Sequence, residues 1–142
     1  LITLNGCSNL DEDNYEFAYE NPLEYEWYLE RSVPWGPFDL PSGSILYNFD
    51  TENSILNVQN NDESIPNILP SGAYPYSIIN QDEKTYILFE EGWSHEFEGD
   101  NFGFRIIYGT QGGSEVLVID TGETNGDFIL PTDQPIYYFR RY

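Results

Sequence analysis

The stretch SILYNFDTENSILNVQN, residues 44–60, decides the fold. In its first half the apolar residues Ile45, Tyr47 and Phe49 fall on every second position, which is the period of a β-strand with one face in a core. A second run of β-forming residues follows the polar turn at 51–53. Two such runs joined by a short polar turn predict an antiparallel hairpin.

The same pattern continues in six further stretches. With the hairpin they make eight expected strands: 24–31, 44–50, 54–60, 72–80, 84–90, 101–108, 115–120 and 135–141. Pro75 lies inside one of them and predicts a bulge or a poorly paired stretch there. Eight sequential antiparallel strands with short connections predict an all-β fold, an up-and-down eight-stranded barrel without exposed strand edges. A β-sandwich is the alternative.

The interior of an eight-stranded barrel is just wide enough to be filled by side chains or to hold one small ligand. Large aromatic rings occupy many of the expected inward positions. These are Tyr25, Trp27, Tyr47, Phe49, Tyr74, Tyr76, Phe104 and Phe139. Because each ring buries a large area, we expect the interior to be filled.

The composition describes one folded domain with a strongly acidic surface. The chain has 142 residues, of which 17% are aromatic, and its formal net charge is −20. This length and aromatic content can bury a core. The charge promotes solubility and disfavours binding of the protein surface to nucleic acids or anionic lipid headgroups. No apolar run is long enough for a transmembrane helix.

The single cysteine, Cys7, ends the sequence LNGC at residues 4–7 and has no partner for a disulfide within the chain. An apolar residue three positions before the cysteine and a small one directly before it resemble a bacterial lipobox. In that motif a diacylglycerol is placed on the thiol and the chain is cut before the cysteine. We therefore expect residues 1–6 to be the end of a signal peptide and Cys7 to anchor the protein in the outer membrane.

An acidic cluster, Asp11, Glu12 and Asp13, follows the cysteine. It resembles the surface-export signal of Bacteroidetes lipoproteins, which implies exposure on the cell surface. The stretch 7–23 is acidic and lacks a sustained helical period. We therefore expect a lipidated tether there, followed by the barrel domain at 24–142.

The chain from Trp27 onwards resembles the small lipocalin-like lipoproteins of Bacteroidetes, particularly of Flavobacteria. The resemblance rests on WYLERSVPWGPFDLPSGSILYNFD (27–50), ILNVQNND (55–62), LPSGAYPYSI (69–78), LVID (117–120) and YYFRR (137–141). It implies a lipocalin-like barrel and a lipid-anchored location. It implies no particular activity.

The same resemblance implies a pair of residues that closes one end of the barrel. In the lipocalin superfamily a Trp on the first strand packs beneath an Arg from the last strand. The matching residues are Trp27 and Arg141, with Arg140 as the alternative. A guanidinium over an indole ring gains cation–π energy while its N–H groups bond nearby acceptors. Tyr25 stands where that superfamily has Gly.

No motif predicts catalysis or a cofactor. The only histidine, His95, has Ser and Glu as sequence neighbours, but neighbours point apart on an extended chain, and no nucleophile elbow is present. A weak calcium candidate gathers Asp120, Glu123, Asn125 and Asp127, which offer hard oxygen ligands. A hairpin loop with an Asn-Gly turn explains the same residues without an ion.

Trp35, Trp93 and Tyr108 lie near expected loops or strand ends and could form a ligand-stacking platform at a barrel mouth. The alternative is that these rings plug the ends of the barrel. We therefore expect a non-catalytic, lipid-anchored envelope protein that binds a small apolar or glycan ligand. The alternative function is a structural or interaction lipoprotein with a filled barrel, which contacts another envelope protein.

Overall fold

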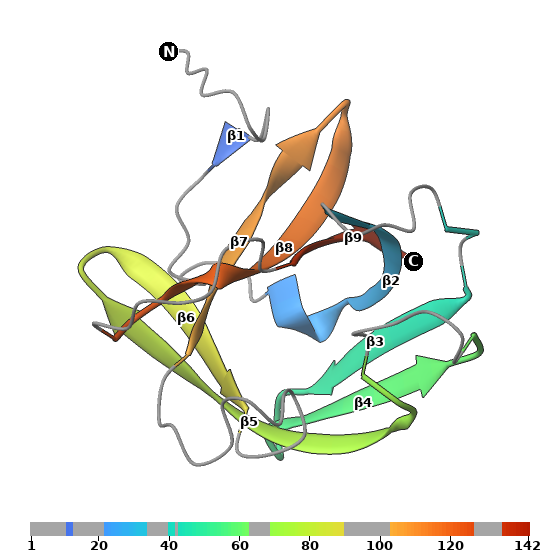
Figure 1. Ribbon diagram of the computed structural model, residues 1–142, viewed down its shortest axis with the longest axis horizontal. Coiled ribbons are helices and arrows are strands. Elements are labelled where there is room, and N and C mark those ends of the chain that lie inside the picture. Colours follow the sequence, from blue (N-terminus) through green and yellow to red (C-terminus); the bar gives the residue numbers. More distant parts are fainter. Residues whose placement is uncertain are drawn as a thin grey trace.

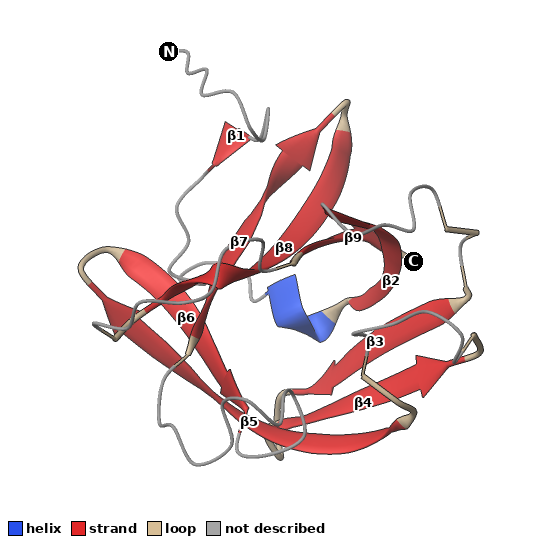
Figure 2. Ribbon diagram, in the orientation of Figure 1, coloured by secondary structure: helices blue, strands red, loops and turns tan. Residues whose placement is uncertain are grey.

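A computed structural model of the chain consists almost entirely of antiparallel β-strands (Figures 1 and 2). It describes residues 11–12, 22–33, 40–41, 43–62, 69–89, 103–126 and 135–142, and for 11–12 it describes the backbone alone. Its elements are β1 (Asp11–Glu12), η1 (Pro22–Glu24), β2 (Glu26–Val33), β3 (Ile45–Asp50), β4 (Ile55–Asn60), β5 (Gly72–Gln81), β6 (Lys84–Phe89), β7 (Phe104–Gln111), β8 (Ser114–Thr124) and β9 (Ile136–Arg141).

Strands β2 to β9 form a closed barrel in which each strand pairs with its neighbours in the sequence. The ring closes where β2 pairs with β9, from Trp27 opposite Arg141 to Val33 opposite Ile136. This confirms the predicted up-and-down eight-stranded barrel and excludes the sandwich. The short strand β1 pairs with β7 beyond the residues of β7 that pair with β6, with Asp11 opposite Thr110 and Glu12 opposite Gly109.

Because successive strands run in opposite directions, the connections alternate between the two ends of the barrel. The turns at 51–54, 82–83 and 112–113, together with η1, lie at one end, which we call the turn end. The connections 34–44, 61–71, 90–103 and 125–135 join strands at the other end, the loop end. All the long connections of the barrel therefore start and finish at the loop end.

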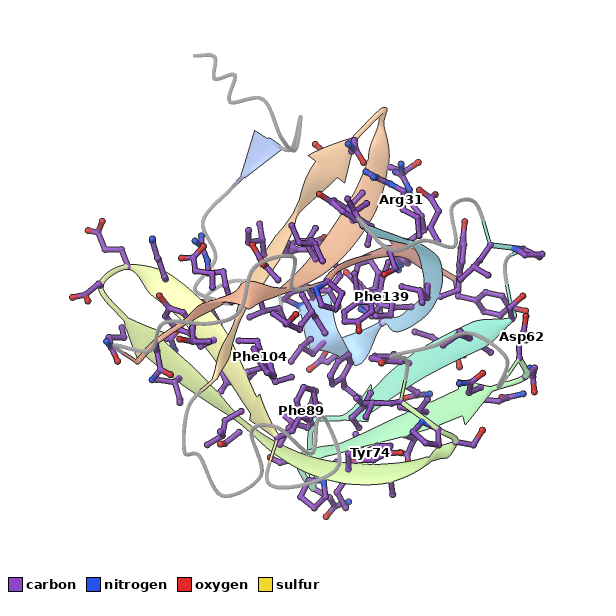
Figure 3. All side chains as sticks on the ribbon, viewed as in Figure 1. Arg31, Asp62, Tyr74, Phe89, Phe104 and Phe139 are labelled. Carbon is purple, nitrogen blue, oxygen red and sulfur yellow. The ribbon has the colours of Figure 1, made fainter. Side chains whose placement is uncertain are left out.

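The barrel interior is filled from all eight strands by a single apolar cluster. The labelled rings of Phe104 and Phe139 lie inside the ring of strands in Figure 3, and both side chains are buried. All eight aromatic residues predicted to point inward belong to this cluster or pack against it. Leu23 of η1 is buried in the same cluster, so η1 acts as a plug.

Several details of the strands differ from the sequence-based expectation. Strand β2 starts and ends two residues later than predicted, and β8 continues to Thr124 where an end at 120 was expected. Strand β7 begins at Phe104 and continues to Gln111, three residues later than predicted at either end, because the Gly112–Gly113 pair makes the turn. Pro75 lies in a regular ladder opposite Ile55 and is the last residue of β5 to pair with β4. The predicted bulge is therefore absent at Pro75, but the predicted poorly paired stretch is present, because β5 pairs with β4 up to Pro75 and with β6 only from Tyr76 onwards. The missing N–H falls at the end of the β4–β5 ladder.

Candidate functional site

The turn end is closed by the first residues of the barrel. Trp27 is fully buried, and its indole Nε1 donates a hydrogen bond of 3.0 Å to the backbone oxygen of Pro22 in η1. Arg141 lies directly opposite Trp27 in the β2–β9 ladder. Its guanidinium stacks on the ring of Tyr25, at 3.5 Å from the centroid. The Arg141 cation therefore stacks on Tyr25, the residue that stands where the resemblance led us to expect Gly.

Glu115 connects this closure to β7 and β8. Its carboxylate accepts hydrogen bonds of 2.7 Å from Tyr108 and from Arg141. Burial raises the pKa of Glu115, but the hydrogen bonds from Arg141 and Tyr108 and the Arg141 charge outweigh it, so this pKa is lowered overall. The ring of Tyr108 packs edge-on against Trp27 at 6.0 Å. The structure thus places Tyr108 in the turn-end plug and not at a mouth between the loops.

The barrel interior brings three tyrosines together from strands that are distant in the sequence. Tyr47 of β3, Tyr74 of β5 and Tyr137 of β9 belong to the inner cluster or pack against it. Burial raises the pKa of Tyr47, and the nearby Tyr137 and Tyr74 raise it further. Burial likewise raises the pKa of Tyr137. The hydroxyl groups of these residues therefore stay protonated and can donate hydrogen bonds.

Tyr47 is the most enclosed of the three, with 2% of its surface exposed. Its ring packs at 4.6 Å from Phe139, and Val58 lies opposite it in the β3–β4 ladder. The Tyr74 hydroxyl donates to the backbone oxygen of Pro70.

The described members of the predicted calcium loop bond to other protein groups. Glu123 contacts Lys84 and Arg105. The Asn125 side-chain oxygen accepts from the Gly103 N–H, and Asp120 accepts from the Gly122 N–H. Among the described residues no group of three or more acidic, His or Cys side chains could hold a metal ion. These residues serve as structural anchors of the β8 end.

All five basic residues of the chain lie on barrel strands, and each contacts a partner. The contacts are Arg31 with the ring of Tyr138, Lys84 and Arg105 with Glu123, Arg140 with Glu30, and Arg141 with Glu115.

Several predicted site residues cannot be placed in this way. Cys7, Asp13, Trp35, Trp93, His95 and Asp127 lie outside the described residues. For Asp11 and Glu12 the structure gives the backbone pairing with β7 and no side-chain contact.

Sequence reasoning listed Tyr47 and Tyr74 as inward rings but did not place them close together, and it missed Tyr137. The alternation of residues along a strand indicates which face a side chain occupies. It does not indicate which residues of non-adjacent strands meet across a barrel. A signal was present nonetheless, because tyrosine at an inward position brings a hydroxyl that needs a partner.

Comparisons with models of protein families, with curated protein sequences and with solved structures found no match. The class of the protein is therefore defined by its fold, a closed antiparallel eight-stranded barrel of the lipocalin-like kind. In the described part of the chain no helix has the length and apolar character needed to cross a membrane.

Proposed function

We propose that this protein is a non-catalytic lipoprotein of the bacterial outer membrane whose barrel binds a small ligand. The observation that supports the proposal is the closed barrel whose apolar interior gathers the rings of Tyr47, Tyr74 and Tyr137. A small ligand that enters there could bury apolar surface and accept a hydrogen bond from a tyrosine hydroxyl.

The position of β1 supports an orientation of the barrel on the membrane. Asp11 pairs with Thr110, nearer the Gly112–Gly113 turn than the partner of Glu12, so the chain before Asp11 leaves towards the turn end. Three residues lie between Cys7 and Asp11, and the four steps from one Cα to the other span at most about 14 Å. A lipid on Cys7 would therefore hold the turn end near the membrane and direct the loop end outwards, where a ligand can enter.

Ligand binding is tested with the uncharged fluorophore N-phenyl-1-naphthylamine. We expect saturable binding of about one probe per chain by fluorescence titration. Val58→Phe, which enlarges an inner side chain beside Tyr47, should weaken binding at least about tenfold. Ser77→Phe adds the same ring on an exposed position of β5 and should leave binding unchanged. Equal binding by the two variants would contradict a ligand site beside Tyr47.

A filled barrel that contacts another envelope protein is the second candidate. Trp27, Leu117 and Phe139 have no exposed surface, so the interior around them is closed to solvent. This packing favours a structural protein that contacts its partner through its outer surface. Absence of any saturable probe binding in the titration would favour this second function.

A further inference from the structure

We infer that the outer surface of β2, β3 and β4, next to the end of β9, binds a neutral oligosaccharide of glucose-type sugars. We call this surface the Tyr142 face. It lies outside the barrel, so the inference goes beyond the proposed function and does not depend on a ligand in the interior. The members of the Tyr142 face are Glu26, Tyr28, Asn48, Asn57, Gln59 and Tyr142.

The ring of Tyr142 is held in place although 63% of the residue's surface is exposed. Its backbone N–H donates a hydrogen bond of 2.8 Å to the Glu26 oxygen, which brings this end of the chain beside β2 (Figure 1). The ring meets that of Tyr28 edge-on at 6.1 Å and lies close to Gly43. Among the described residues no other large hydrophobic side chain is exposed. A ring that is already positioned loses little freedom when a ligand stacks on it.

A row of polar side chains crosses the neighbouring strands beside this ring. Glu26 of β2 pairs with Asn48 of β3, and Asn48 pairs with Asn57 of β4 on its other side. The residues next to them in β3 and β4 belong to the inner cluster, so the row faces outwards. Asn48, Asn57 and Gln59 are exposed to solvent. Because neighbouring strands lie about 5 Å apart, the row extends over about 10 Å, which favours an oligosaccharide over a single sugar.

This combination of groups suits a sugar. An amide both donates and accepts hydrogen bonds and a carboxylate accepts them, so Asn48, Asn57 and Glu26 can bond sugar hydroxyls. A glucose-type ring carries its hydroxyls around its edge and presents C–H groups on its faces, and such a face can stack on Tyr142. A wholly apolar molecule would remove the amides from water and leave their hydrogen bonds unmade.

The charges of the Tyr142 face disfavour an acidic glycan. Arg140, which lies opposite Tyr28 in the β2–β9 ladder, forms an ion pair of 2.8 Å with Glu30 and also donates to the Gln111 backbone oxygen. Glu26 adds a negative charge to the row, and the whole chain carries a net charge of −20. A glycan carboxylate would be repelled by this potential, whereas a neutral oligosaccharide meets no such repulsion.

A protein partner fits the same surface less well. A protein interface typically has an apolar core of several large side chains inside a polar rim. On the Tyr142 face a single exposed ring is bordered by amides and a carboxylate, so such a core is missing. The composition therefore favours the glycan.

The test is isothermal titration calorimetry of the full chain with cellohexaose and with laminarihexaose. We expect saturable binding of at least one of them, with a Kd between about 10 μM and 1 mM. Hexagalacturonate, a hexamer with a carboxylate on every sugar, should not bind at the same concentrations. Absence of binding by both neutral hexamers would overturn the inference, and so would binding of hexagalacturonate at equal or higher affinity.

Variants on the surface of the barrel locate the site. Tyr142→Ala removes the ring and should weaken binding of the neutral hexamer at least about tenfold, whereas Tyr142→Phe keeps the ring and should stay within about threefold of the wild type. Asn48→Ala should weaken binding about 2- to 12-fold, the effect of one net hydrogen bond. Gln81→Ala removes an exposed amide at the end of β5 and is the matched control. Wild-type affinity in Tyr142→Ala would place the glycan elsewhere and contradict the assignment.

A competition experiment separates this inference from the proposed function. Because the Tyr142 face lies outside the barrel, a saturating neutral hexamer should leave the affinity for N-phenyl-1-naphthylamine unchanged. Displacement of the fluorophore by the hexamer would contradict two separate sites. Hexamer binding without any fluorophore binding would refute the proposed interior site and leave the glycan site standing. Urea unfolding of Tyr142→Ala at a midpoint near that of the wild type shows that a loss of affinity is not a loss of the fold.

Discussion

Single residues at the turn end do more than fill space. Trp27, Arg141 and Tyr25 were linked by resemblance and position alone, and the structure gives the link a different geometry, with the cation on Tyr25. The sequence could supply the residues of this plug because they lie at the start of the first barrel strand and the end of the last. It could not supply Glu115, whose two hydrogen bonds depend on a hairpin that no local pattern connects to Arg141.

Two acidic residues of β8 should affect the pH dependence of stability in opposite directions. The folded pKa of Glu115 is lowered from the usual 4.5 because the bonds from Arg141 and Tyr108 outweigh burial. Its carboxylate therefore stabilises the fold at pH values above the ordinary pKa of 4.5. This contribution is lost as the pH falls through the lowered pKa of the folded state. Glu115→Gln should lower the free energy of unfolding at pH 7 by about 0.5–1 kcal/mol, and the difference should vanish in acid.

The pKa of Asp120 is shifted in the opposite direction, so a variant at this residue is the natural comparison for Glu115→Gln. Burial raises its pKa from the usual 3.8, more than the Gly122 N–H and the Arg105 charge lower it. Its charged form therefore costs stability at neutral pH, and the cost disappears as the pH falls. Asp120→Asn should be more stable than the wild type at pH 7 and equal to it near pH 3. Urea unfolding across pH 3–8 measures the free energy of unfolding of both variants. If both changed in the same direction with pH relative to the wild type, the opposite pKa shifts of Glu115 and Asp120 would be refuted.

At the scale of elements, the strands were predictable and the way they end was less so. The inward residues of β3 follow from alternation, because a strand with one buried face has no other period. The boundaries of β7 did not follow, because its end is set by the positive φ angles of Gly112 and Gly113 and not by its apolar residues. The break in the β2–β9 register between Leu29 and Arg31 was also missed, since no sequence signal marked Glu30 as the extra residue.

The turn between β5 and β6 carries strain that a single substitution should relieve. Asp82 and Glu83 have φ angles of 54° and 63°, a region in which a side chain costs about 1–2 kcal/mol per residue. Glu83→Gly should therefore raise the free energy of unfolding by about 1 kcal/mol. Glu52→Gly removes the same charge from the β3–β4 turn without a positive φ to relieve, and it should lower stability by about 0.5–1 kcal/mol. Loss of stability in both variants would contradict the strain.

At the scale of the whole molecule, charge is distributed according to the topology of the barrel. The Lys and Arg residues lie on the strands, where each contacts a partner, and the loop-end connections contain acidic residues but neither Lys nor Arg. The fold class could be predicted from the sequence because eight strand-length runs with short turns have few ways to close. The group of Tyr47, Tyr74 and Tyr137 could not be predicted, because these residues come from β3, β5 and β9, which only the closed barrel brings together.

Anchoring is the property of the whole molecule that is most directly tested. In a Bacteroidetes host, radiolabelled palmitate should enter the wild-type protein and should not enter Cys7→Ala, because the thiol is the proposed attachment point. Equal labelling of the two would refute lipidation at this residue. Replacing Asp11, Glu12 and Asp13 together by Ala should leave the label intact and reduce digestion by external protease, since the acids are the proposed export signal. Unchanged digestion would reduce the acidic cluster to a solvated tether whose contribution is the β1–β7 pairing.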